Sequence, residues 1–412
     1  FAEDFTVVGD CETSDGHRLF FTAQDDENGR ELWVSDGSTE GTKLVKDINP
    51  GTTDGYFYPF EPRVDSSSPR ELVAVGDLLY FAADDGENGT ELWVSDGTES
   101  GTKLVKDINS GFDDRDYFYT KAGKSRPIEN PVPLSSNPAG LTEFNDKLYF
   151  AADDGINGTE LWVSDGTESG TVLVKDIPAG GGGSSPQSLT NVNGVLYFVA
   201  DDGVNGSELW KSNGTVGGTF IVKDVFISFT SSAPINLIAS NEKLYFYAND
   251  GTHGFELWES DGTTVGTKLV KDINPVSAGG NNNSFPREPY LVRETLYFTA
   301  FNELKSWQIW KTTNDERGAV LVTDIPNTAV FDGLYIPFFV KAIEDTILFV
   351  TFTQETGEEF WSYKPVQLAV ANIETNSPLL CFKDANGTIE VTMEGGIGPK
   401  DLFTYQWNNP DL

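Results

Sequence analysis

The chain has 412 residues, with 28 Lys and Arg against 64 Asp and Glu, which gives a formal net charge of −36. So negative a surface repels phosphate backbones and anionic headgroups, which excludes nucleic acid and membrane surfaces as partners but leaves cations and neutral polymers such as glycans. The sequence has no run of about 20 apolar residues, so we predict no direct membrane insertion. Two cysteines, Cys11 and Cys381, are too few for a disulfide framework and too far apart for a metal motif.

Three short signatures recur along the chain at constant spacing. The first is Leu-Tyr-Phe or a close variant, and in all seven copies a tryptophan follows its first residue by 14 positions. An aspartate, in Val-Lys-Asp-Ile or a relative, follows six of these tryptophans by another 14 positions. The tryptophans are Trp33, Trp93, Trp162, Trp210, Trp258, Trp310 and Trp361. The aspartates are Asp47, Asp107, Asp176, Asp224, Asp272 and Asp324. Such regular spacing indicates a chain built of structural repeats.

Each repeat is predicted to form four short strands separated by turns. In the second copy the expected strands span 71–75, 79–83, 91–95 and 103–108, where apolar, β-branched and aromatic residues alternate. Asp-Asp-Gly-Glu-Asn-Gly and Asp-Gly-Thr-Glu-Ser-Gly are typical turn sequences. No segment has a useful helical period. We therefore predict an all-β fold, a seven-bladed β-propeller of four-stranded blades over residues 1–371, with the tryptophans packed between blades.

The blades are expected to close into a ring, because closure removes the open sheet edges that invite aggregation. The first copy begins with a strand at 5–8, with too little chain before it to supply a strand elsewhere. The seventh copy has Thr375 where the aspartate is expected, so we infer that 366–371 forms its outer strand. A solenoid of the same units is the competing architecture, but it needs capping repeats that the sequence does not show.

A proline precedes six of the seven Leu-Tyr-Phe starts by 10 positions, and the links from each aspartate to the next of these prolines differ in length. The first two span 22 and 31 positions and the other four span 10 to 14. In a propeller these links emerge beside the hairpins between second and third strands, so the insertions indicate a binding face. Their aromatic rings suit stacking on sugars or anchoring a protein partner; the alternative is that they pack the long loops onto the rim. The predicted ligand-binding residues are Tyr56, Phe57, Tyr58, Phe60, Phe112, Tyr117, Phe118 and Tyr119.

The hairpin Asp-Asp-Gly-x-Asn-Gly-x-Glu places two carboxylates and an amide on a glycine-rich loop. Oxygen ligands of this kind could bind Ca²⁺, a hard cation, although the loop lacks the spacing of an EF-hand. The alternative is that Asp, Asn and Gly only provide the positive φ angles of a tight hairpin. The candidate Ca²⁺ ligands are Asp84, Asp85, Asn88, Asp153, Asp154 and Asn157.

Catalysis finds little support in the sequence. His17 and His253 lie in an inserted loop and in a turn, and neither belongs to a pattern that orients a base toward a nucleophile. Carboxylate pairs suited to glycoside hydrolysis are expected from abundance alone among 64 acidic residues. We therefore predict a non-enzymatic binding module without a certain cofactor. Two alternatives remain, a propeller glycosidase or lyase and a purely structural subunit docked in a surface assembly.

The repeat consensus resembles a known family. Leu-Tyr-Phe-x-Ala-x-Asp-Gly-x-Asn-Gly-x-Glu-Leu-Trp-x-Ser-Asp-Gly-Thr-x-x-Gly-Thr is similar to the ELWxxDGT repeat family of bacterial exported proteins, over about residues 4–371. The match is strong in copies one to five and fades in copies six and seven, where the turn motifs are replaced. The resemblance implies a location at the cell surface and assigns no catalytic residues.

The tail, 372–412, resembles another family. The stretch Cys381-Phe-Lys-Asp-Ala-Asn-Gly, followed by Phe403-Thr-Tyr-Gln-Trp, is similar to the first part of an SprB-type repeat. Alternation at 388–393 and 404–407 supports a partial small β domain of Ig-like type. In that family a second cysteine closes the repeat, which implies that the partner of Cys381 is not in this chain.

SprB-type repeats occur in tandem in large surface adhesins of gliding Bacteroidetes. The resemblance therefore implies gliding motility, export by the type IX secretion pathway and an extracellular location on the bacterial cell surface. The expected partners are a surface polysaccharide or a protein, together with further domains of the same long polypeptide.

Overall fold

The computed structural model describes residues 3–8, 18–53, 63–113, 118–121, 124–127, 132–178, 180–227, 230–240, 243–275, 282–303, 306–323, 338–343, 346–353, 357–363, 387–390 and 404–407. Every regular element in these ranges is a β-strand, as the sequence predicted. Within the described residues, no helix is long and apolar enough to cross a membrane. The chain divides into two compact units, unit 1 (Phe1–Val270) and unit 2 (Lys271–Leu412), which are described separately.

Unit 1 consists of five four-stranded antiparallel sheets in which the strands follow one another in chain order. The second sheet contains β7 (Arg70–Val75), β8 (Leu78–Asp84), β9 (Thr90–Ser95) and β10 (Lys103–Lys106). These bounds lie within two residues of the predicted strands. The first sheet contains β1 (Glu3–Val8), β2 (Arg18–Asp25), β3 (Gly29–Ser35) and β4 (Lys43–Lys46). The third contains β15 (Ala139–Phe144), β16 (Lys147–Asp153), β17 (Thr159–Ser164) and β18 (Val172–Lys175).

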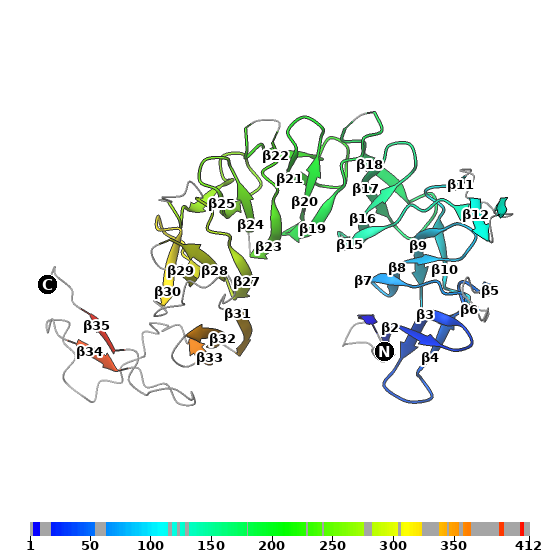
Figure 1. Ribbon diagram of the computed structural model, residues 1–412, viewed down its shortest axis with the longest axis horizontal. Helices are drawn as coiled ribbons and strands as arrows, with labels where there is room; N and C mark the ends of the chain where they lie inside the picture. The colour runs from blue at the N-terminus through cyan, green and yellow to red at the C-terminus, as the bar shows by residue number, and fades with distance from the viewer. Residues whose placement is uncertain are drawn as a thin grey trace. The chain divides into compact units, whose positions relative to one another are not determined.

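The fourth and fifth sheets repeat this pattern. They contain β19 (Gln187–Val192), β20 (Val195–Asp201), β21 (Ser207–Ser212), β22 (Phe220–Lys223), β23 (Ile235–Ser240), β24 (Lys243–Asn249), β25 (Phe255–Ser260) and β26 (Lys268–Lys271). The first strands of successive sheets contact one another, from β1 to β7, β15, β19 and β23. In Figure 1, β15, β19 and β23 lie along one side of the unit, and β18 and β22 along the other. Four-stranded meanders arranged in this way are β-propeller blades, so the predicted fold class is confirmed.

Unit 2 contains the sixth and seventh repeats. The sixth is a four-stranded sheet of β27 (Arg287–Val292), β28 (Thr295–Asn302), β29 (Ser306–Thr312) and β30 (Ala319–Thr323). The seventh is a three-stranded sheet of β31 (Phe338–Ile343), β32 (Thr346–Thr353) and β33 (Gly357–Tyr363). In the tail, β34 (Gly387–Glu390) pairs with β35 (Thr404–Trp407). All seven predicted repeats thus form a sheet.

Three sequence-based expectations stay predictions. The segment 366–371, expected to form the outer strand of the seventh blade, lies outside the described residues, as does the expected domain boundary between 371 and 372. The third is the closure of the blades into one ring, which would require contacts between the two units and stays a prediction.

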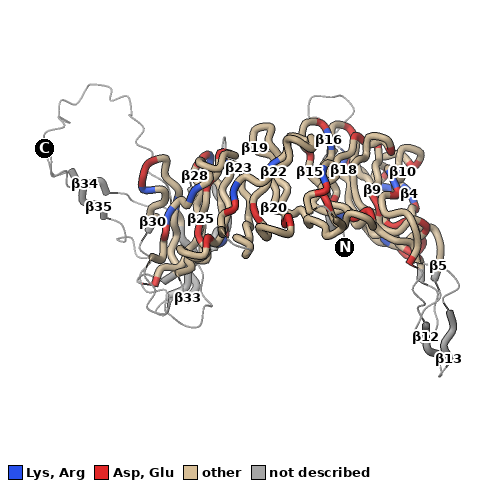
Figure 2. The backbone as a smooth tube through the Cα atoms, turned by 90° about the horizontal axis from the view of Figure 1, so that it is seen from above, with Lys and Arg blue, Asp and Glu red and all other residues tan. Residues whose placement is uncertain are grey.

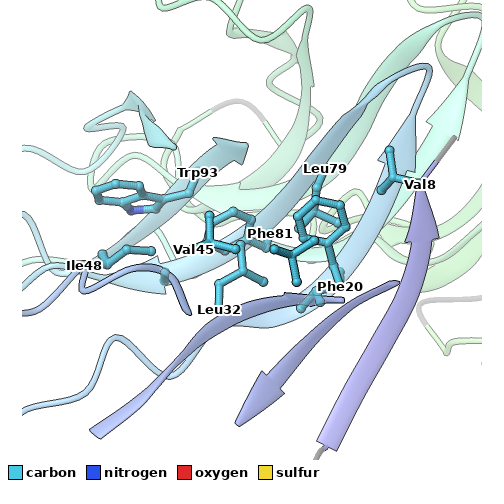
Figure 3. Packing of buried hydrophobic residues seen from close by; sticks show 11 residues of the cluster. Val8, Phe20, Leu32, Val45, Ile48, Leu79, Phe81 and Trp93 are labelled. Carbon is cyan, nitrogen blue, oxygen red and sulfur yellow. The ribbon is translucent and has the colours of Figure 1, made fainter. Parts of the chain in front are cut away.

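The hydrophobic core lies between neighbouring sheets. One cluster of buried residues joins Val45 and Ile48 of the first blade to Leu79, Phe81 and Trp93 of the second (Figure 3). Equivalent clusters join each later pair of blades in unit 1. A blade therefore cannot bury its apolar faces alone and depends on its neighbours for stability. The predicted position between blades is confirmed for Trp93, Trp162, Trp210 and Trp258.

A lysine of each blade reaches over the tryptophan of the next. Lys46 Nζ lies 5.6 Å from the ring centroid of Trp93 and donates a hydrogen bond of 2.9 Å to the carbonyl oxygen of Thr102. The ammonium group gains a cation–π attraction and also satisfies a backbone carbonyl of the next blade. The same pair of contacts is made by Lys106, Lys175 and Lys223.

The Asp-Gly-Thr-x-x-Gly-Thr turn between third and fourth strands closes through its own side chains. Asp96 Oδ1 accepts hydrogen bonds from the N–H (2.9 Å) and the hydroxyl (2.7 Å) of Thr98. These bonds, that of the hydroxyl first, hold the pKa of Asp96 below its usual value. Ser95 Oγ and Thr102 Oγ1 lie 2.7 Å apart across the base of the turn. The motif is therefore structural.

The glycine of this turn leaves room for a tyrosine of the preceding blade. Gly166 has φ +86°, and a Cβ on it would lie 2.5 Å from the hydroxyl oxygen of Tyr80. A Cβ on Gly214 would meet Tyr149 in the same way, at 2.2 Å. The tyrosine of Leu-Tyr-Phe therefore packs on the turn of the next blade.

We expect Gly166→Ala to destabilise the chain by about 2–4 kcal/mol, because it adds a steric clash to the strain of a left-handed backbone. Gly37→Ala is the matched control and should cost about 1–2 kcal/mol, since Gly37 has φ +91° and nothing within 4 Å of an added Cβ. Urea unfolding measures both variants. Tyr80→Phe should recover part of the difference, and equal losses in the two variants would contradict the packing of Tyr80 on Gly166.

Candidate functional site

The hairpins between second and third strands and the links between blades lie on the same side of unit 1, which we call the hairpin face. A Cβ on Gly86 would lie 2.8 Å from Asn49 Oδ1, in the link that precedes the blade. A Cβ on Gly89 would lie 2.2 Å from the carbonyl oxygen of Leu134, in the link that follows it. The hairpin 84–89 therefore lies between two links, as the sequence predicted.

Short strand pairs form the two long insertions on this face. In the first insertion, β5 (Thr52–Thr53) pairs with β6 (Arg63–Val64). In the second, β11 (Phe112–Asp113) pairs with β14 (Val132–Pro133), and β12 (Phe118–Lys121) pairs with β13 (Lys124–Pro127). Asp65 N donates to Gly51 O in the first and Leu134 N to Gly111 O in the second, so both insertions begin and end at equivalent points.

The aromatic residues predicted to bind a ligand belong to these insertions. Phe112 is 58% exposed, at the base of the second insertion. Phe118 and Tyr119 are part of β12. The remaining aromatic candidates lie outside the described residues, namely Tyr56, Phe57, Tyr58, Phe60 and Tyr117. Cys11, His17 and Cys381 also lie outside them.

The acidic hairpin uses its candidate calcium ligands to close the turn. Asp85 Oδ1 accepts hydrogen bonds from the backbone N–H of Glu87 (2.9 Å) and Asn88 (2.7 Å), and Asp85 Oδ2 accepts one from Asn88 Nδ2 (2.8 Å). Asp84 Oδ1 accepts a further bond from the N–H of Gly86 at 2.7 Å. The turn is therefore complete without an ion.

The third and fifth blades repeat this turn. Asp154 accepts the same three bonds from Ile156 and Asn157, and Asp153 accepts one from Gly155. Burial alone would raise the pKa of Asp154, but these hydrogen bonds outweigh it and lower the pKa. In the fifth blade His253 takes the place of the asparagine, and its Nδ1 lies 2.7 Å from Oδ2 of Asp250. This gives the histidine a turn-closing contact.

A second aspartate lies near the acidic hairpins of the first and second blades. Burial raises the pKa of Asp47, and the negative charge of Asp25 raises it further. Asp107 and Asp85 are related in the same way. Among the described residues, however, no group of three or more His, Cys, Asp or Glu could hold a metal ion. Calcium binding therefore stays a prediction from the sequence.

A buried glutamate joins each blade to the next, in an arrangement that we call the glutamate clip. Glu91 is fully buried, and its Oε1 accepts a 2.7 Å bond from the N–H of Ser136. Its Oε2 accepts bonds from Ser136 Oγ at 2.5 Å and from the N–H of Ile108 at 3.1 Å. Ile108 follows the fourth strand of the same blade, whereas Ser136 precedes the first strand of the next. The same bonds are made by Glu31 with Ser67, Glu160 with Ser184 and Glu208 with Ser232.

The clip has an unusual electrostatic environment. Burial raises the pKa of Glu91 to about 7, against the opposing effect of its bonds from Ser136 and Ile108, and the charge of Asp107 adds to the rise. Glu31 has the same shift, to about 7, for the same reasons. Our sequence analysis did not single out this glutamate. Two signals were available, since a Glu lies two residues before the tryptophan and a Ser two residues before the proline in successive copies, and charged residues are seldom buried without a partner.

Comparison with known protein families gives a match in the tail of the chain. The sequence matches the SprB repeat over residues 373–412. No curated protein matches the chain. Among solved structures, puromycin hydrolase is similar at 12% identity and a TM-score of 0.44, over 87% of this chain and 50% of that chain.

Two further solved structures are similar at the same level. The β-propeller domain of the trilobed protease from Pyrococcus furiosus matches at 11% identity and a TM-score of 0.37, over 89% of this chain and 96% of that chain. A prolyl endopeptidase matches at 12% identity and a TM-score of 0.44, over 84% of this chain and 46% of that chain. The chain thus spans half the length of the puromycin hydrolase chain. The hydrolase and peptidase activities belong to those proteins, and the blade fold of this chain follows from its own strand topology.

We expect Asp85→Ala to destabilise the chain by about 1–3 kcal/mol, because three hydrogen bonds to one carboxylate are lost. The loss should be the same in excess CaCl₂ and in EDTA, since the bonds need no ion. Thermal unfolding in both buffers measures it, with Glu87→Ala as the control that keeps its backbone N–H. A stabilisation by calcium that the wild type shows and Asp85→Ala lacks would instead identify the hairpin as a calcium site.

The glutamate clips predict a pH dependence of stability. A folded-state pKa of about 7 for Glu91 exceeds its value of 4.5 in the absence of burial, so the folded state binds more protons between these values. The resulting stabilisation is fully present below pH 4.5 and is lost as the pH rises through 7, by about 1.4 kcal/mol for each unit of pKa difference. Glu91→Gln should flatten this part of the dependence.

Unfolding midpoints of Glu91→Gln and of the wild type, measured between pH 4.5 and 8, test this pH dependence of stability. Gln308 occupies the equivalent position of the sixth blade and is 1% exposed, so the fold accommodates glutamine there. Glu87→Gln is the control for the loss of one surface charge. Parallel pH profiles of Glu91→Gln and the wild type would show that the clip does not titrate in this range.

Proposed function

We propose that this chain is a non-enzymatic binding module of a large bacterial cell-surface protein, similar to a gliding adhesin, and that it binds a polysaccharide or a protein partner through the hairpin face. The observation that carries the proposal is the SprB repeat at 373–412. Repeats of this type occur in tandem in large surface adhesins. The resemblance supports an extracellular location, type IX export and further domains in the same polypeptide.

The architecture of unit 1 supports a binding role. Five blades joined by clips form a stiff scaffold, and both long insertions leave it on the hairpin face. Loops carried on a rigid scaffold are where binding residues usually lie. Acidic residues are spread over the repeats of unit 1 (Figure 2), which disfavours anionic ligands. A neutral glycan or a protein surface fits these conditions.

The enzymatic alternative has less support among the described residues. Glu31 and Glu91, whose pKa values burial raises to about 7, have the perturbed pKa expected of a general acid. Both side chains are fully buried and hydrogen-bonded in the clips, so substrate cannot reach them. The structural alternative, a subunit docked in a surface assembly, is distinguished by its single fixed protein partner.

The first test replaces the aromatic residues of the first insertion, Tyr56, Phe57, Tyr58 and Phe60, by serine in the whole chain. Binding to immobilised polysaccharides and to bacterial cells should fall at least about tenfold, because aromatic anchors contribute most of the binding energy at such surfaces. Thermal unfolding of the variant and of the wild type checks that any loss of binding is not a loss of the fold.

Ile156→Ser with Val204→Ser is the matched control, because these apolar side chains are 78% and 60% exposed on hairpins of the same face. Unchanged binding by the aromatic variant would refute this site assignment. Turnover of a polysaccharide that is lost on changing one acidic pair would favour the glycosidase or lyase alternative.

A further inference from the structure

From the second blade on, the chain enters each first strand of unit 1 through the sequence Ser-x-Pro-x-x, which we call the entry loop and whose last two residues begin the strand. The four entry loops span 67–71, 136–140, 184–188 and 232–236. In every copy the serine and the proline are buried, and the three other positions are exposed or partly exposed. The serine is the residue held by the glutamate clip of the preceding blade.

The entry loops are held rigidly from two sides. In the fourth blade, Ser184 N donates to Glu160 Oε1 at 2.8 Å, and Ser185 N donates to the carbonyl oxygen of Thr159 at 2.9 Å. From its own blade, Asp201 N donates to the carbonyl oxygen of Ser184 at 3.0 Å. The exposed side chains of the loop are therefore presented by a fixed backbone, which reduces the entropy lost when they bind a ligand.

Two exposed positions of each entry loop have a left-handed backbone. In the fourth blade Ser185 has φ 49° and Ser188 has φ 56°, and the other three copies have positive φ at the same two positions. The strand pairing is irregular between Gln187 and Thr190, so the second position belongs to a β-bulge. Left-handed backbone strains residues other than glycine, and strain and bulges of this kind gather at functional sites, where they redirect side chains.

The exposed positions also differ in sequence from copy to copy, whereas the buried positions do not. They present amides and hydroxyls at Asn137, Gln187, Ser188 and Asn236. Their charged residues in unit 1 are Arg70 and Glu71, of opposite sign. In a repeat, the fold requires the same residue at each buried position, and only the exposed positions are available to match a ligand.

Neighbouring entry loops form a continuous row on the hairpin face. Glu71 Oε2 accepts a 3.2 Å hydrogen bond from the N–H of Leu141, in the first strand of the next blade. A Cβ on Gly140 would lie 3.6 Å from Leu189 Cδ1, one blade further. The first strands β7, β15, β19 and β23 follow one another without interruption (Figure 1).

We propose that this entry-loop row binds a neutral polysaccharide chain, with the side chains of Asn137, Gln187, Ser188 and Asn236 hydrogen-bonded to sugar hydroxyls. The inference rests on the proposed function and specifies its ligand class and residues. A row with one set of polar groups per blade suits a polymer of repeating units, and amides both donate to and accept from hydroxyls.

The charges of the row exclude other ligands. Its two charged residues cancel, although the chain as a whole carries −36, so an ionic ligand would find no matching charge. A polyanion would also be repelled by the surrounding surface. Most exposed positions of the row carry small or polar side chains, so an apolar side chain of a peptide ligand could bury little apolar area there.

The decisive variant combines Asn137→Gly, Ser188→Gly and Asn236→Gly. Glycine adopts the left-handed backbone without strain, so the melting temperature should not fall, while the ligand groups are removed. Gly140 occupies the same position as Ser188 in the third blade, so the loop accepts glycine. Affinity for soluble neutral polysaccharides (dextran, xylan and mannan), measured by titration calorimetry and affinity electrophoresis, should fall by about tenfold or more.

The matched control is Ser100→Gly with Ser169→Gly, two exposed serines in turns at the opposite end of the strands, which should bind as the wild type does. Gln187→Ala gives a second variant, at a position whose backbone is not left-handed.

If the wild type binds a neutral polysaccharide and both entry-loop variants bind it equally well, the assignment of the binding site to the entry-loop row is wrong, although the proposed function stands. Loss of a protein partner instead of a polysaccharide would overturn the ligand class, and binding of alginate in preference to dextran would do the same. A wild type that binds neither cells nor polysaccharides nor proteins contradicts the proposed function itself.

Discussion

A buried carboxylate must be surrounded by hydrogen-bond donors, and this requirement organises the repeats of this protein. Glu91 has no exposed surface and takes its donors from Ile108 and Ser136. The clip therefore holds three points together: the third strand of a blade, the exit from its fourth strand and the entry to the next blade. Removing one donor would leave a buried charge unsatisfied, which costs far more than the bond itself contributes. The direction of the chain between blades follows from this constraint.

The other residues of the consensus serve the same junction. The lysine lies over the tryptophan of the next blade, and the tyrosine packs on the next glycine turn. Leucine and phenylalanine fill the core between sheets (Figure 3). The constant part of the repeat therefore describes an interface between blades. Recognition must come from positions that the interface does not use, which are the long insertions and the exposed residues of the entry loops.

Several features of the site could be predicted and others could not. The strand pattern, the tryptophans between blades and the side on which the insertions emerge followed from spacing and turn chemistry. The hairpin aspartates were weighed as calcium ligands or as turn residues, and Asp85 with Asn88 closes the turn. The glutamate clip and the strained entry loops were missed. A glutamate beside Leu-Trp has the same appearance whether it faces water or three buried donors, and positive φ at Ser188 has no sequence signature comparable to glycine.

The sequence alone determined the number of repeats, their all-β class and the resemblance of the tail to an SprB repeat. Alternation of apolar residues and the spacing of turns are local properties, so they can be read along the chain. The tertiary structure decided which polar residues meet. Glu31 and Ser67 are 36 positions apart, and Glu91 and Ser136 are 45 positions apart, because the insertions lie between them. The glutamate and the serine each recur at a fixed place in the repeat, but nothing in the sequence shows that they pair, and only the packing of one blade on the next brings them together.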